Sequence, residues 1–138
     1  MNREPIGIAV VGHGTTASQM LAAARMIADN EALEDVIAID AGPGETPTLS
    51  TTMCDAIAKA DRGRGVLVLV DLLGASPCQC AQREAGGHPL LVVAGVNLAM
   101  LLKVTGIDRT STELDDLARL CADAGHRAIA ITQGRGAA

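Results

Sequence analysis

Hydrophobic positions along the chain form short continuous runs, and between these runs apolar residues recur at intervals of three or four. Continuous runs are typical of strands buried on both faces of a sheet. They occupy 6–11, 36–39, 66–70 and 90–94. Intervals of three or four are typical of helices that cover a sheet. They occupy 16–29, about 45–60, a stretch beginning at Ser76, 97–104 and 111–124. A last apolar run, 128–131, predicts a fifth strand.

The alternation of strands and helices predicts the fold class. Such an order is typical of an α/β protein with an open, doubly wound, mainly parallel sheet and helices on both faces. A length of 138 residues is that of a single domain. We therefore expect one domain with its core at about 6–131 and a tail at 132–138.

Polar residues and glycines follow the predicted strands. In parallel sheets the carboxyl ends of the strands meet at one edge, where ligands bind. The residues expected at this edge are Gly12, His13, Gly14, Thr15, Asp40, Gly42, Asp71, Gly74, Ser76, Gly95 and Asn97. One edge of the sheet thus gathers a histidine, two aspartates and several hydroxyl groups, and we expect the chemistry of the protein there.

Composition excludes some classes of function. The net charge is −5 and the chain has no Phe, Tyr or Trp, so it has neither the basic surface nor the stacking platforms of nucleic-acid-binding proteins. The sequence shows no leader and no apolar stretch of about 18 residues, which predicts a cytoplasmic protein with no membrane insertion and with reduced thiols. Cys78 and Cys80 lack the CxxC spacing of a metal site, and a site made by them with His88 is a weakly supported alternative.

His13 is the candidate nucleophile. The helix that begins beyond it would direct free N–H groups toward the imidazole, and a helix N-terminus favours an anion. That anion would be a bound phosphate, or one carried covalently by His13, because histidine is a nucleophile when one ring nitrogen is free and the other is held. Asp71 is the predicted holder, and Ser76 offers a hydroxyl to the phosphoryl oxygens. The alternative is that His13 only closes a turn and that Asp71 is a solvated loop residue.

Three segments together resemble a known family. They are GIAVVGHGTTASQML (7–21), VLVDLLGASPC (68–78) and VAGVNLAML (93–101). They are similar to the signature segments of the mannose-type IIA components of the bacterial phosphoenolpyruvate-dependent sugar phosphotransferase system (PTS). Two positions depart from the family pattern, since Ala75 replaces a common glycine and Ala99 a common proline. Neither change removes a reactive group.

The resemblance implies a fold and a reaction. The fold would have four parallel strands and a fifth antiparallel strand, in a protein that is usually a homodimer. The protein would be a cytoplasmic phosphotransferase that can lie against a membrane permease complex. It would accept a phosphoryl group from the small carrier protein HPr and pass it to a mannose-type IIB protein for sugar uptake. The relay would require no metal and no cofactor.

The resemblance also assigns roles to residues. His13 would carry the phosphoryl group, and Asp71 would hydrogen-bond its ring. Gly14, Thr15 and Ser76 would bind the phosphate. Gly74 and Asn97 would shape the site, although helix capping explains Asn97 equally well.

Two other interpretations of the same domain remain open at this point. The phosphohistidine could serve as a regulatory signal, as in domains fused to transcription regulators or in dihydroxyacetone-kinase subunits. Alternatively, the protein could be an anion-binding module that is never phosphorylated.

Of the remaining polar residues, Asp40 is predicted to form a turn. His88, at the amino edge of the sheet, is predicted to be a plain surface residue.

Overall fold

Four parallel strands form one sheet. The computed structural model describes residues 3–28, 31–43, 46–72 and 87–134. The strands, in their order across the sheet, are β2 (Ile37–Asp40), β1 (Gly7–Gly12), β3 (Val66–Val70) and β4 (Leu90–Ala94). All three pairings are parallel, so the four carboxyl ends lie at the same edge. This arrangement confirms the predicted α/β fold.

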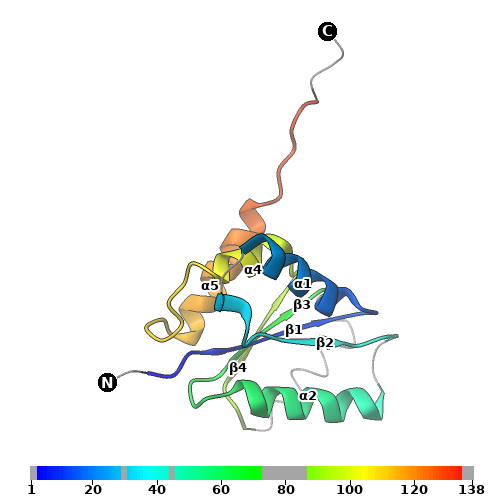
Figure 1. The fold of residues 1–138 in the computed structure, drawn as a ribbon, viewed down its shortest axis with the longest axis vertical. Coiled ribbons are helices and arrows are strands. Elements are labelled where there is room, and N and C mark those ends of the chain that lie inside the picture. Colours follow the sequence, from blue (N-terminus) through cyan, green and yellow to red (C-terminus); the bar gives the residue numbers. More distant parts are fainter. Residues whose placement is uncertain (1–2, 29–30, 44–45, 73–86, 135–138) are drawn as a thin grey trace.

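Helices cover both faces of the sheet (Figure 1). On one face lie α1 (Thr16–Ala28), α4 (Leu98–Val104) and α5 (Leu114–Arg127). On the other face lies α2 (Pro47–Ala60). A short 3₁₀ turn, Glu31–Leu33, precedes β2. The helix predicted to begin at Ser76 lies outside the described residues.

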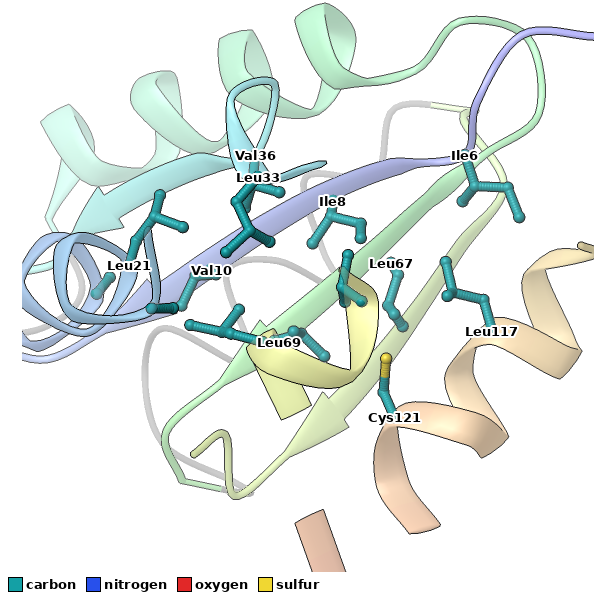
Figure 2. Packing of buried hydrophobic residues seen from close by; sticks show 14 of the residues in the cluster. Ile6, Ile8, Val10, Leu21, Leu33, Val36, Leu67, Leu69, Leu117 and Cys121 are labelled. Atoms are coloured by element: carbon teal, nitrogen blue, oxygen red, sulfur yellow. The ribbon is translucent and has the colours of Figure 1, made fainter. Parts of the chain in front are cut away.

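The core consists of two layers that share the central strands. Alternate residues of β1 and β3 point to opposite faces, so Ile8, Val10, Leu67 and Leu69 pack under α1, α4 and α5 (Figure 2). Leu117 and Cys121 of α5 belong to the same layer (Figure 2). The intervening residues pack against α2. Every residue of β1 and β3 is buried, which explains their continuous apolar sequence. The two strands end at the sheet edge that carries His13 and Asp71.

Several element boundaries differ from the predicted ones. β1 and β2 each begin and end one residue later than expected. The last helix begins at Leu114 rather than at residue 111. Asp108 explains this shift, because its carboxylate accepts hydrogen bonds from Thr110 and its carbonyl from Ser111 and Thr112. A hydrogen-bonded turn thus occupies the residues that the apolar spacing assigned to the helix.

The predicted fifth strand is wrong for this chain. After α5, residues 129–134 have no regular structure, and the segment runs away from the body of the protein (Figure 1). Ile129 and Ile131 are 76% and 101% exposed. A strand needs a neighbouring strand to accept its backbone hydrogen bonds, and no described strand of this chain lies beside this segment. Residues 128–131 are apolar, but no strand in the described part of the chain pairs with them.

Candidate functional site

His13 lies directly after β1, where the chain turns into α1. Its carbonyl oxygen accepts hydrogen bonds from the backbone amide of Thr16 at 3.1 Å and from the Thr16 hydroxyl at 2.7 Å. A Cβ atom on the preceding Gly12 would lie 2.2 Å from that hydroxyl oxygen. Only glycine therefore fits before His13 while Thr16 closes the turn.

Asp71 holds His13 at two points. This aspartate follows β3, the strand next to β1. Its Oδ2 accepts a hydrogen bond from the His13 backbone amide at 2.9 Å and lies 3.0 Å from Nδ1 of the ring. The His13 side chain remains 36% exposed. The structure thus brings together the two residues that the sequence singled out, and it excludes the interpretation of Asp71 as a solvated loop residue.

The contacts of Asp71 keep it ionised. Partial burial raises the pKa of the carboxyl group, but the hydrogen bonds from the His13 amide, from its ring and from the Leu72 amide together outweigh burial and lower it below its ordinary value. An ionised carboxylate can accept the Nδ1–H of a neutral imidazole. The Nε2 lone pair is then the one available to react.

The expected phosphate-binding residues receive different support. Gly14 has a positive φ of 57°, and its amide donates to the carbonyl of Gly42 at 2.8 Å. A phosphate that used this amide would have to replace that bond. Thr15 is exposed beside His13, and its carbonyl accepts from the amide of Gln19. Ser76 and Gly74 lie outside the described residues.

Asn97 serves as a helix cap and lines a cavity. Its Oδ1 accepts from the amide of Met100 at 3.1 Å at the start of α4, and its Nδ2 donates to the carbonyl of Gly125 at 3.2 Å. Helix capping is therefore confirmed. Asn97 also borders a cavity of about 240 Å³ between the end of β4 and α5, whose lining includes neither His13 nor Asp71.

Sequence reasoning missed two side-chain pairs. The Asp40 carboxylate accepts hydrogen bonds from both the amide and the hydroxyl of Ser18, so Asp40 does more than form a turn. Nδ1 of His88 lies 2.6 Å from Oδ2 of Asp61, so His88 is not a plain surface residue. In each pair the two residues are far apart along the chain. The presence of the aspartate was the only sequence signal for a hydrogen-bonded pair.

Neither a metal site nor a membrane span is found within the described ranges. No cluster of three or more His, Cys, Asp or Glu residues that could hold a metal ion occurs there. Cys78 and Cys80, which the alternative metal site would need, lie outside these ranges. None of the helices in the described part of the chain is long and apolar enough to cross a membrane.

The fold and the site define a class of protein. It is an open α/β protein that presents, at the carboxyl edge of its sheet, a histidine oriented by an ionised aspartate. The model of the EIIA-man family, described as "PTS system fructose IIA component", matches residues 7–121. The chain therefore belongs to the EIIA-man family of the sugar phosphotransferase system.

Individual relatives agree with this assignment. The PTS system mannose-specific EIIAB component of Escherichia coli (strain K12) is 34% identical over 126 residues, which are 90% of this chain and 38% of that protein. This chain thus spans less than two fifths of that relative. Among solved structures, the mannose/sorbose-specific IIA subunit from Enterococcus faecalis has a TM-score of 0.80 at 26% identity, and covers 98% of this chain and 100% of its own. The EIIA component from Streptococcus agalactiae has a TM-score of 0.75 at 27% identity, over 91% of this chain and 96% of its own.

Family membership supports a role in phosphoryl relay. Members of this family are phosphotransferases that act through a phosphohistidine.

Proposed function

We propose that this protein relays a phosphoryl group through Nε2 of His13. It receives the group from the phosphohistidine of HPr and passes it to a mannose-type IIB protein for sugar uptake. The observation that carries the proposal is the pairing of Nδ1 with Oδ2 of Asp71 in a side chain that is still 36% exposed. One ring nitrogen is held, and the ring remains accessible to a second protein.

The proposed step is a direct exchange between two histidines. The lone pair on Nε2 of His13 forms a bond to phosphorus while the bond between phosphorus and the donor's ring nitrogen breaks. The electrons of the broken bond return to the donor ring as a lone pair. The His13 ring gains positive character, and the Asp71 carboxylate on Nδ1 stabilises it. Because donor and acceptor are chemically alike, the protein needs mainly to position the ring and to balance charge.

The test is phosphorylation by phosphoenolpyruvate, enzyme I and HPr. We expect the chain to gain one phosphoryl group that is labile in acid and stable in base, as measured by intact mass. His13→Ala should gain none. The matched control is His126→Ala, which removes an exposed histidine at the end of α5 and should be phosphorylated normally. A wild-type chain that gains no phosphoryl group would leave anion binding as the function of this site.

Transfer onward is a separate test of the acceptor. The phosphorylated chain, freed of HPr, should lose its phosphoryl group when a mannose-type IIB protein is added, and the IIB protein should gain it. Retention of the group by His13 in the presence of IIB would contradict a transport role and favour a regulatory one.

We also propose that the protein acts as a homodimer. Support comes from the exposed apolar residues Ile129 and Ile131 and from β4, which has a strand on one side only within the described sheet. The side chains of Ile129 and Ile131 of one copy would be buried against the other copy. Ile129→Asp/Ile131→Asp should therefore sediment as a monomer. Met26→Asp, which alters an equally exposed residue on α1, should not change the oligomeric state.

A further inference from the structure

Asp40 connects the end of β2 to the first turn of α1. Its Oδ1 accepts the backbone amide of Ser18 at 3.0 Å, and its Oδ2 accepts the Ser18 hydroxyl at 2.5 Å. Ser18 lies in the first turn of a helix that begins at Thr16, and amides in a first turn have no partner within the helix. A carboxylate from a neighbouring strand therefore does what a capping side chain normally does from within the helix itself.

The end of β2 also holds the backbone on both sides of His13. The amide of Ala41 donates to the carbonyl of Gly12 at 2.8 Å, and the amide of Gly14 donates to the carbonyl of Gly42 at 2.8 Å. These bonds use backbone atoms only, so substitutions hardly alter them. The contact between Asp40 and Ser18 is the one part of this connection that depends on a side chain.

Three strands thus determine where the His13 ring points. β1 delivers His13, and Asp71 at the end of β3 holds Nδ1. The helix α1 contacts His13 through the amide and hydroxyl of Thr16. Asp40 restrains α1 from the β2 side.

We propose that Asp40 is a positioning residue for phosphoryl transfer through His13. This inference rests on the proposed function. By fixing Ser18, Asp40 holds the first turn of α1 and with it the Thr16 contacts that support His13. Asp40 also accepts hydrogen bonds from the amide and the hydroxyl of Ser18. Because these two donors are occupied, other groups must donate to the phosphoryl oxygens. Loss of the carboxylate lets α1 shift against the sheet and lets the His13 ring leave the line of attack.

The first experiment measures transfer from phosphorylated HPr in four variants. We expect Asp40→Ala to lower kcat about 5- to 20-fold with KM for phosphorylated HPr unchanged, because orientation rather than docking is lost. Asp40→Asn should retain most of the rate, since its amide oxygen can still accept from Ser18. Ser18→Ala should show a smaller loss, and Ser18→Ala/Asp40→Ala should be no slower than Asp40→Ala alone, because both residues act through one contact.

The matched control is Asp55→Ala, which removes the same charge from an exposed position of α2 on the opposite face of the sheet. It should leave kcat unchanged. Wild-type or faster transfer by Asp40→Ala, an equal loss in Asp55→Ala, or additive losses at Ser18 and Asp40 would each overturn the positioning role.

A second measurement separates this inference from the proposed function. The nitrogen NMR signals of the His13 ring in wild type should report one tautomer, with the proton on Nδ1. In Asp40→Ala they should report a mixture, and the amides of the first turn of α1 should exchange faster with solvent. If the wild type takes no phosphoryl group, the proposed relay fails, and the ring signals alone decide whether Asp40 positions His13. Ring signals that are unchanged in Asp40→Ala contradict the positioning role.

Discussion

At the scale of single residues, chemical character in this protein depends on what each side chain contacts. Asp71 and Asp61 are both aspartates beside a histidine, and hydrogen bonds lower the pKa of each in spite of burial. Cys121 differs, because it is fully buried in the layer that also holds Leu67 and Leu117, and burial raises the pKa of its thiol to about 11. Cys54, on α2, is exposed to solvent instead.

Alkylation should distinguish these two cysteines. In the folded protein at pH 8, iodoacetamide should modify Cys54, while Cys121 should stay unmodified over hours, because the thiolate is the reactive form and burial disfavours it. Peptide mapping by mass spectrometry checks each site, and both should react in denaturant. Modification of Cys121 at the rate of Cys54 in the native protein would contradict its burial.

Removal of the Asp71 carboxylate should slow phosphorylation of His13. Asp71→Asn loses the charge that stabilises the developing imidazolium, and we expect the rate to fall about 10- to 100-fold, the range known for the hydrogen-bond partners of metal-ligating histidines. Rapid-quench transfer from phosphorylated HPr measures the effect. The variant should still fold, so its circular dichroism spectrum should match the wild type. A rate within two-fold of wild type would show that Asp71 is dispensable.

At the scale of elements, turns and caps join the strands to the helices. Thr46 caps α2 by accepting the amide of Leu49, and Asn97 caps α4. Asp61 ends α2 and arranges the turn into β3, where its Oδ1 accepts the amides of Gly63 and Gly65. Its other oxygen holds His88, just before β4. One carboxylate thus fixes the start of two neighbouring strands.

Stability in acid should depend on Asp61. Burial raises its pKa, but hydrogen bonds from His88, Gly65 and Gly63 lower it overall. A carboxyl whose pKa is lowered on folding stabilises the protein above its unfolded pKa of about 3.9, and this stabilisation is lost as the pH falls through the folded value. Urea unfolding at pH 7 should show a loss of free energy in Asp61→Asn. The difference from wild type should shrink as the pH drops below about 4.

At the scale of the whole molecule, the two edges of the sheet carry different groups of residues. The carboxyl edge carries His13 and Asp71. At the amino edge, arginines tie distant segments together. Arg109 is 9% exposed and donates to the carbonyl of Ile6 at 2.7 Å, to the carbonyl of Ala32 at 3.2 Å and to Asp35 at 2.5 Å. It thereby connects the entry to β1, the 3₁₀ turn and the segment before α5.

Arg109→Ala should destabilise the whole fold. It leaves the carbonyl of Ile6 without its side-chain donor and frees three segments, so we expect a loss of about 1–3 kcal/mol in the free energy of unfolding. Arg127→Ala is the control, because Arg127 is 74% exposed and pairs with Asp123 on the same helix, and it should change stability little. Chemical denaturation measures both. Equal effects would show that the contacts of Arg109 are not special.

Much of the fold and part of the site could be predicted from the sequence. The continuous apolar run 66–70 matches β3, since a strand buried on both faces cannot tolerate polar residues. The sequence predicts His13 and Asp71 at the same edge, because the carboxyl ends of parallel strands lie together. Ser18 with Asp40 and His88 with Asp61 could not be foreseen, because no local pattern relates residues 22 and 27 positions apart.

The sequence by itself determined the alternation of strands and helices, the sheet edge that holds His13 and Asp71, and the family. These follow from periodicity, from the common direction of the strands and from three motifs. Only the tertiary structure decided which side chains form hydrogen bonds with one another and where the apolar run 128–131 lies. The pattern of buried positions is a local property, because it follows from the order of apolar and polar residues within each segment. Side-chain partners and strand neighbours depend on the positions of segments far apart in the chain, and no single segment encodes those positions.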